Sequence, residues 1–255
     1  MISLASPAER LAAKKGLYGI LNSVPHPDIV EMIAVAGYDF VILDLEHLPH
    51  DESRLKHCIQ LAQQGGCAPL VRIAADDIPR AGRLLDLGAH GIVLSRTESV
   101  AQIAALRDAM FFPPAGRRGI TGGSVTGFGT LPLEDYIERA NRGLWLVPMI
   151  ETPRGIDAAD AIAAVPEVSL VMEGALDLAI SMGLGPQPAH PQVAAQIGNL
   201  AECCAQAGTP FCANPRTPDQ QAHWQRLGVR CWLCGEDRGF IFRALRQRLD
   251  DAGRD

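Results

Sequence analysis

Eight short apolar runs alternate along the chain with longer segments in which apolar residues recur every three or four positions. The runs span residues 17–23, 40–47, 69–74, 91–96, 144–152, 168–174, 209–215 and 230–237. Nearly continuous apolar runs of this length are typical of strands buried on both faces, as in a parallel sheet. Eight such strand–helix units in 255 residues predict a single-domain α/β protein, a (β/α)8 TIM barrel spanning residues 1–255.

A doubly wound open sheet is the alternative arrangement of the same elements. That fold usually holds its ligand at a glycine-rich turn after the first strand. No G-x-G-x-x-G motif follows residues 17–23, so the sequence favours the barrel.

One segment interrupts the alternation. Residues 113–130, PPAGRRGITGGSVTGFGT, contain six glycines and show no helical period. A loop of this length inside a compact domain is usually either functional or disordered. We interpret it as a lid over the active site or as an interface loop between subunits, with a plain surface loop as the alternative.

Charge and composition restrict the classes of partner. The formal net charge of −6 argues against a nucleic acid or an anionic membrane as the partner. No apolar stretch approaches the ~20 residues of a membrane helix, and the N-terminal residues show no signal-peptide pattern. Seven cysteines, an odd number, fit a reducing compartment better than a disulfide framework. These features predict a cytoplasmic protein that acts on small molecules.

Ionisable residues gather at the carboxyl ends of the predicted strands, where barrels of this kind carry their chemistry. They are Asp44, Glu46, His47, Arg72, Arg96, Glu151, Glu173, Asp177, Arg216, Glu236, Asp237 and Arg238. Polar groups are tolerated at these ends because the strands emerge into a solvated cleft, where burial costs less. The sequence therefore predicts an active site at this end of the barrel.

Several of these residues also have a structural interpretation. His47 could be a hydrogen-bonded core histidine, although two neighbouring carboxylates favour a functional role. Arg72 could close an ion pair across the barrel mouth. Glu151 and Asp177 are oxygen donors that suit a divalent cation such as Mg²⁺, but two carboxylates alone are weak evidence for a metal site.

The motifs also carry a resemblance to a known family. From about residue 16 to residue 245 the chain resembles the HpcH/HpaI aldolase/citrate lyase family. The pieces that carry it are GYDFVILDLEH, LVRIA, LLDLGAHGIVL, FFPPAGRRG, MIETPRG and GALDLAISMGL followed by HP. The resemblance implies a (β/α)8 barrel assembled as a homo-oligomer, from dimer to hexamer. It also implies the chemistry of class II aldolases, which act on pyruvate or other 2-oxo acids.

The same resemblance assigns roles to individual residues. His47, paired with Asp44, looks like the acid/base dyad. Arg72 looks like the residue that binds the carboxylate of the 2-oxo acid. Glu151 and Asp177 look like the metal ligands, and Ala175 in the motif before Asp177 is carried over as a substrate contact.

The chain departs from the aldolase pattern of apolar-Gly-Pro-x-Asp-Leu-Ser before the second metal ligand, because it reads EGALDLA at residues 173–179. Together with ITGG, TGFGT and PFCANPR, this variant resembles a narrower branch, the citrate synthases of staphyloferrin B siderophore biosynthesis. That branch implies condensation of oxaloacetate with acetyl-CoA. It also implies that Mg²⁺, if bound, is dispensable.

This branch suggests further roles. Oxaloacetate has two carboxylates, so we expect a second cation beside the site, with Arg216 as the candidate. Glu173 either transfers a proton or pairs with an arginine. Arg117, Arg118 and Arg238 are candidates for the phosphates of CoA, while contact with a neighbouring subunit is the alternative for Arg117 and Arg118. A metal-dependent 2-oxo acid aldolase is the second interpretation of the whole chain, and a non-catalytic ligand sensor is the third.

Overall fold

The computed structural model describes residues 4–48 and 51–253, which form a closed barrel of eight parallel strands in sequence order. The strands are β1 (Leu17–Asn22), β2 (Phe40–Asp44), β3 (Ala68–Ile73), β4 (Gly91–Leu94), β5 (Trp145–Ile150), β6 (Val171–Glu173), β7 (Phe211–Ala213) and β8 (Cys231–Glu236). Each strand pairs with the next, and β8 pairs with β1 to close the barrel. The predicted (β/α)8 barrel is confirmed.

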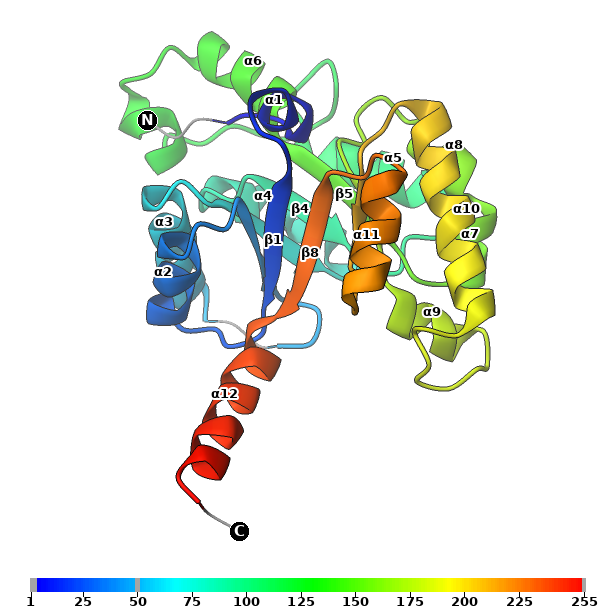
Figure 1. Cartoon of the computed structure of the whole chain (residues 1–255). Helices are drawn as coiled ribbons and strands as arrows, with labels where there is room; N and C mark the ends of the chain where they lie inside the picture. Colours follow the sequence, from blue (N-terminus) through cyan, green and yellow to red (C-terminus); the bar gives the residue numbers. More distant parts are fainter. Residues whose placement is uncertain (1–3, 49–50, 254–255) are drawn as a thin grey trace.

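Helices surround the barrel and connect its strands (Figure 1). They are α1 (Pro7–Ala13), α2 (Pro27–Val35), α3 (Glu52–Gln64), α4 (Ala81–Asp86), α5 (Val100–Met110), α6 (Leu133–Gly143), α7 (Pro153–Asp157), α8 (Ala159–Ala163), α9 (Ala175–Ser181), α10 (Pro191–Ala207), α11 (Pro218–Arg226) and α12 (Asp237–Asp251). Two 3-10 helices, η1 (Ala75–Arg80) and η2 (Ser124–Gly129), complete the set. None of these described helices is long and apolar enough to cross a membrane.

The interior of the barrel is filled by large side chains rather than by a channel. Phe40 and Trp145 are fully buried there, with ring centroids 5.8 Å apart. Their packing depends on Gly19, because a Cβ at that position would lie 2.0 Å from the Phe40 ring. The solid interior leaves the loops at the strand ends as the place where a ligand can bind.

Short polar side chains set where the helices begin after the strands. Ser99, Thr152 and Thr217 each occupy the N-cap position and accept a backbone N–H from the first turn of α5, α7 and α11. Such caps satisfy N–H groups that would otherwise have no partner. They also fix the lengths of the loops that surround the carboxyl ends of the strands.

Residues 113–130 lie at the end of the barrel opposite the predicted site. They follow α5, which returns from the carboxyl end of β4, and they precede α6, which leads into β5. Figure 1 shows α6 beside α1, at the far end of the barrel from the start of α12. The segment therefore does not form a lid over the site of its own chain. The interface interpretation of this segment stays a prediction.

The last helix, α12, leaves the barrel instead of packing against it. Figure 1 shows it starting where β8 ends and pointing away from the other elements. Of its residues only Asp237 is buried, while Phe242 and Leu245 are each 63% exposed. On β1, Tyr18 is 42% exposed, so the outer surface of that strand is only partly covered by the chain itself.

Candidate active site

The parallel pairing of β2 with β3 places Asp44 directly beside Arg72. Arg72 donates from Nε to Asp44 Oδ1 at 2.9 Å and from Nη2 to Oδ2 at 2.8 Å, and both residues are buried. Burial by itself would raise the pKa of Asp44, but the hydrogen bonds and charge of Arg72 lower that pKa below its ordinary value. The two residues form a bidentate ion pair that fixes the guanidinium at the carboxyl ends of the strands.

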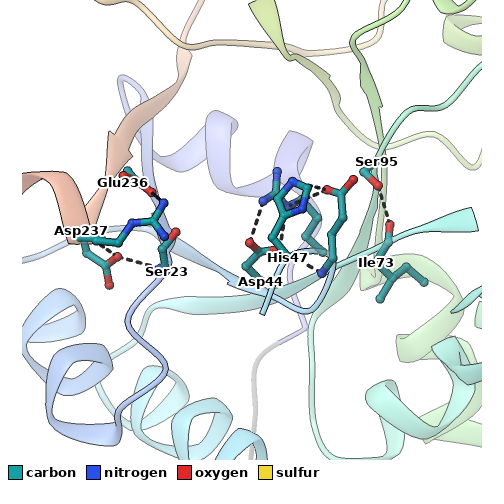
Figure 2. Close-up of polar contacts among 10 residues, drawn as sticks. Ser23, Asp44, His47, Ile73, Ser95, Glu236 and Asp237 are labelled. Carbon is teal, nitrogen blue, oxygen red and sulfur yellow. Dashed lines mark hydrogen bonds and ion pairs between the residues drawn. The ribbon is translucent and has the colours of Figure 1, made fainter. Parts of the chain in front are cut away.

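Glu46 connects this ion pair to His47, as Figure 2 shows. Its Oε2 lies 3.3 Å from Arg72 Nε and 3.7 Å from His47 Nε2. The His47 side chain is 63% exposed, so it faces the cleft and is not a core histidine.

The expected pairing of His47 with Asp44 is therefore not what the structure shows. Both oxygens of Asp44 accept hydrogen bonds from Arg72, and Oδ1 also accepts from the backbone N–H of Glu46. The carboxylate in contact with His47 is Glu46. The sequence places all three residues within four positions, but which of them pair is decided by β3, 28 residues further on.

Glu151 follows β5 and is buried deep in the site, at 3% exposure. Its Oε1 accepts a hydrogen bond of 2.7 Å from the backbone N–H of Arg96. Burial raises the pKa of Glu151 to about 7, and the nearby charges of Glu46 and Asp177 raise it further, against the opposing effects of the Arg96 N–H and of Arg72. A carboxyl group in this state can both donate and accept a proton near neutral pH.

Glycine at position 174 is required for the position of Glu151. A Cβ added to Gly174 would lie 2.4 Å from Glu151 Oε2. The backbone at the end of β6 therefore approaches the carboxyl group directly, which contributes to its exclusion from water. Sequence analysis identified Glu151 as an oxygen donor, but nothing in the sequence shows how deeply this carboxyl is buried.

Glu173 at the end of β6 is fully enclosed and links the next strand ends. Its Oε2 accepts from Ala175 N and its Oε1 from Asn214 N, each at 2.9 Å. Arg216 Nη1 lies 3.7 Å from Oε1. Burial raises the pKa of Glu173, against the charge of Arg216 and the two backbone N–H groups. Of the two roles expected for Glu173, the structure shows the pairing with an arginine.

The metal-binding residues expected from the resemblance lie near each other. The half-buried Asp177 is in the first turn of α9, and its charge raises the pKa of Glu151. In the described part of the chain no group of three or more His, Cys, Asp or Glu side chains is arranged to hold a metal ion. Because Mg²⁺ commonly uses only one or two carboxylates together with water and substrate oxygens, the donor pair Glu151 and Asp177 fits this ion.

Two of the arginines expected to bind CoA lie elsewhere. Arg118 is buried at the amino end of the barrel, 2.7 Å from Asp86 Oδ1, with its guanidinium over the ring of Phe112. Arg117 is 85% exposed at the same end and lies 3.2 Å from Asp108. Neither arginine reaches the site of its own chain, because the barrel lies between. The sequence could not show this, since both follow a helix whose direction is known only from the fold.

Arg238, by contrast, lies at the site end of the barrel. Its Nη2 contacts Glu236 Oε2 at 3.0 Å, and its side chain is 61% exposed. The neighbouring Asp237 accepts hydrogen bonds from Asn22 Nδ2 at 2.5 Å and from Ser23 N at 2.7 Å (Figure 2). These contacts join the start of α12 to the end of β1.

The fold and this cluster define a barrel protein with an immobilised arginine, a buried carboxyl of raised pKa and an exposed histidine at one end. Such a set can bind a carboxylate and move a proton at a carbon next to a carbonyl group. The sequence profile of the HpcH/HpaI aldolase/citrate lyase family matches residues 18–232. The chain belongs to this family.

Individual relatives include both aldolases and a citrate synthase. The 5-keto-4-deoxy-D-glucarate aldolase of Enterobacter sp. (strain 638) is 29% identical over 243 residues, which cover 95% of this chain and 94% of the relative. The crystal structure of the citrate synthase SbnG superimposes with a TM-score of 0.90 at 33% identity, covering 98% of both chains. That of an HpcH/HpaI aldolase from Desulfitobacterium hafniense gives 0.89 at 26% identity, covering 96% of this chain and 95% of the other.

Proposed function

We propose that this protein is a citrate synthase that condenses oxaloacetate with acetyl-CoA, giving citrate and CoA for staphyloferrin B-type siderophore biosynthesis. The observation that carries the proposal is the presence of Arg216, beside the buried Glu173, in addition to Arg72 at the carboxyl ends of the strands. Oxaloacetate has two carboxylates, whereas pyruvate has one. The similarity to the citrate synthase SbnG over 98% of both chains supports the same choice.

Arg72 is placed to bind one substrate carboxylate. Its contacts with Asp44 and Glu46 use Nε and Nη2. The N–H groups of Nη1 remain for the substrate, at a guanidinium whose orientation is already fixed. Arg216 is 29% exposed and has its charge partly balanced by Glu173, so we propose it for the second carboxylate.

The reaction requires two proton transfers. His47, oriented by Glu46 at Nε2, takes a proton at Nδ1 from the methyl group of acetyl-CoA. The resulting enolate carbon forms a bond to the carbonyl carbon of oxaloacetate, and the carbonyl oxygen becomes an alkoxide. Glu151, with a pKa of about 7, donates a proton to that oxygen. Water then cleaves the thioester of citryl-CoA, which releases citrate and CoA.

If Mg²⁺ binds, Glu151 and Asp177 hold it together with water and substrate oxygens. The ion would polarise the carbonyl group of the 2-oxo acid. We propose that the condensation does not require it, because fixed guanidinium groups and a protonated carboxyl can stabilise a developing oxyanion. For CoA phosphates, Arg238 is the candidate on the site side of the barrel.

The test is oxaloacetate-dependent release of free CoA from acetyl-CoA, with citrate identified as the product. A metal-dependent 2-oxo acid aldolase is the second candidate, favoured by the relatives at 29% identity and by the retained Glu151 and Asp177. An aldolase would cleave 5-keto-4-deoxy-D-glucarate to pyruvate and release no CoA, and a sensor would bind ligand without turnover.

Metal dependence is tested on a chelated sample whose metal content has been measured. We expect CoA release to survive exhaustive EDTA treatment and to change less than about twofold on addition of Mg²⁺. Activity that is lost on chelation and restored by Mg²⁺ would contradict the metal-independent mechanism.

We also propose that the protein is a homo-oligomer, between dimer and hexamer. The apolar side chains of α12 and the partly covered outer surface of β1 belong to the same side of the barrel. A helix that leaves its own barrel and a strand that lacks full cover are complementary surfaces in two copies of one chain.

A further inference from the structure

A cavity of about 400 Å³ lies at the amino end of the barrel, remote from the candidate active site. Its walls come from the chain before α1, from the end of α4, from residues 113–130 and from α6. Most of the lining is aliphatic, with contributions from Leu85, Ala89, Val125, Leu131 and Leu144. The volume is at the small end of the range of ligand sites, roughly 300–1,000 Å³.

Arg118 also lines this cavity and supplies its only strongly buried charge among the residues described. Its side chain is 2% exposed, and Nη2 donates to Asp86 at 2.7 Å and to the hydroxyl of Tyr136 at 3.4 Å. Nε and Nη1 are buried without a hydrogen-bond partner in the described part of the chain. Buried N–H groups of a charged side chain nearly always have an acceptor, so this arrangement indicates that an acceptor is supplied from outside.

The position of the guanidinium also shows what kind of acceptor fits. Asp86 balances the charge but is 31% exposed and contacts Nη2 alone, which leaves the buried side of Arg118 for a second anion. One guanidinium can bind one anionic group. The aliphatic walls cannot solvate a second one, which excludes dicarboxylates and polyphosphates such as CoA.

We propose that this cavity is a binding site for a small monocarboxylate with an apolar body, whose carboxylate accepts from Arg118. The apolar part of the ligand contacts Val125 and Leu131 on one side and Leu85 and Leu144 on the other. Because the site lies across the barrel from Arg72, binding here is independent of oxaloacetate and of the function proposed above.

The experiment uses the full-length protein and hexanoate as the probe, with hexanamide as its uncharged analogue. Isothermal titration calorimetry is combined with methyl NMR of the leucine and valine side chains. We expect saturable one-to-one binding of hexanoate, at least tenfold weaker binding of hexanamide, and shifts in the signals of Val125 and Leu131. Saturating oxaloacetate leaves the hexanoate affinity unchanged.

Two variants and one control locate the site. Arg118→Met removes the cation at similar length and should weaken hexanoate at least tenfold, whereas Arg117→Met, the same change at the exposed neighbour, should alter it less than twofold. Since Arg118→Met could impair folding, Val125→Trp fills the cavity while keeping Arg118 and should also abolish binding.

The proposal is overturned if hexanoate shows no saturable binding, if hexanamide binds equally well, or if Val125→Trp binds hexanoate normally. Displacement of hexanoate by oxaloacetate would likewise overturn it by placing the probe at the strand ends. In that case buried water would be the acceptor for Arg118.

Discussion

The residue with the least ordinary environment is Arg72, which is both an anchor for substrate and a partner in a buried ion pair. Its pKa is raised because the hydrogen bonds and charge of Asp44 outweigh the effect of burial. Removing one partner of such a pair leaves a buried charge without compensation, at a cost of about 3–5 kcal/mol. A large truncation at this position would therefore mix a loss of catalysis with a loss of stability.

Arg72→Lys separates the two effects. Lysine keeps the charge beside Asp44 but lacks the planar fork that lets one guanidinium contact Asp44 and a substrate carboxylate together. We expect kcat/KM for oxaloacetate to fall by about 10²-fold or more while circular dichroism and Tm show a folded protein. Arg80→Lys, an exposed pair with Asp77, is the matched control and should be nearly silent. Wild-type kcat/KM in Arg72→Lys would rule out the role of the fork.

Glu151 gives a prediction about pH at the same scale. Its pKa is raised from 4.5 to about 7 in the folded protein, so the folded state binds the proton more tightly than the unfolded state. The associated stability is fully present below about pH 4.5 and is lost as pH rises through 7, a change of roughly 3 kcal/mol. Glu151→Gln should remove this slope from a plot of Tm against pH and should also reduce turnover. An unchanged slope in the variant would show that Glu151 titrates normally.

Among the elements, the junction between β6 and α9 has the tightest geometry. The chain must pass Glu151 at a distance that only glycine permits. We expect Gly174→Ala to displace the carboxyl and to lower kcat by an order of magnitude or more, since displacements near 1 Å are costly in catalysis.

Gly198→Ala is the control for this substitution. Gly198 lies in α10 with no atom within 4 Å of an added Cβ, so alanine should leave kcat unchanged and stabilise the helix slightly. If both variants have wild-type kcat, the close contact at Gly174 does not matter for the reaction.

The elements also show what the sequence could and could not predict. All eight strands were predictable because apolar runs buried on both faces leave a continuous pattern, although β6 and β7 are only three residues long, shorter than predicted. The contact of His47 with Glu46 instead of Asp44 was not predictable, because it depends on the register between β2 and β3. The amino-end position of Arg118 depends on the direction of α5, which no local pattern reveals.

For the whole molecule, the unpacked α12 predicts how the protein associates. Phe242→Glu and Leu245→Glu each place a charge on a surface that we expect a second copy to cover. Light scattering after gel filtration should show the wild type as an oligomer and these variants shifted toward the monomer. Gln247→Glu, a polar position on the same helix that contacts Asp251, is the control and should keep the wild-type mass. A monomeric wild type would contradict the oligomer.

The ion pair between β2 and β3 has a consequence for how this barrel can change its substrate. The group that recognises a carboxylate is attached to two paired strands, whereas the residues around the rest of the substrate lie on the loops after β6, β7 and β8. Strands tolerate little displacement, but loops accept insertions and new side chains readily. Directed evolution toward a different 2-oxo acid should therefore collect its substitutions in those three loops and leave positions 44 and 72 untouched.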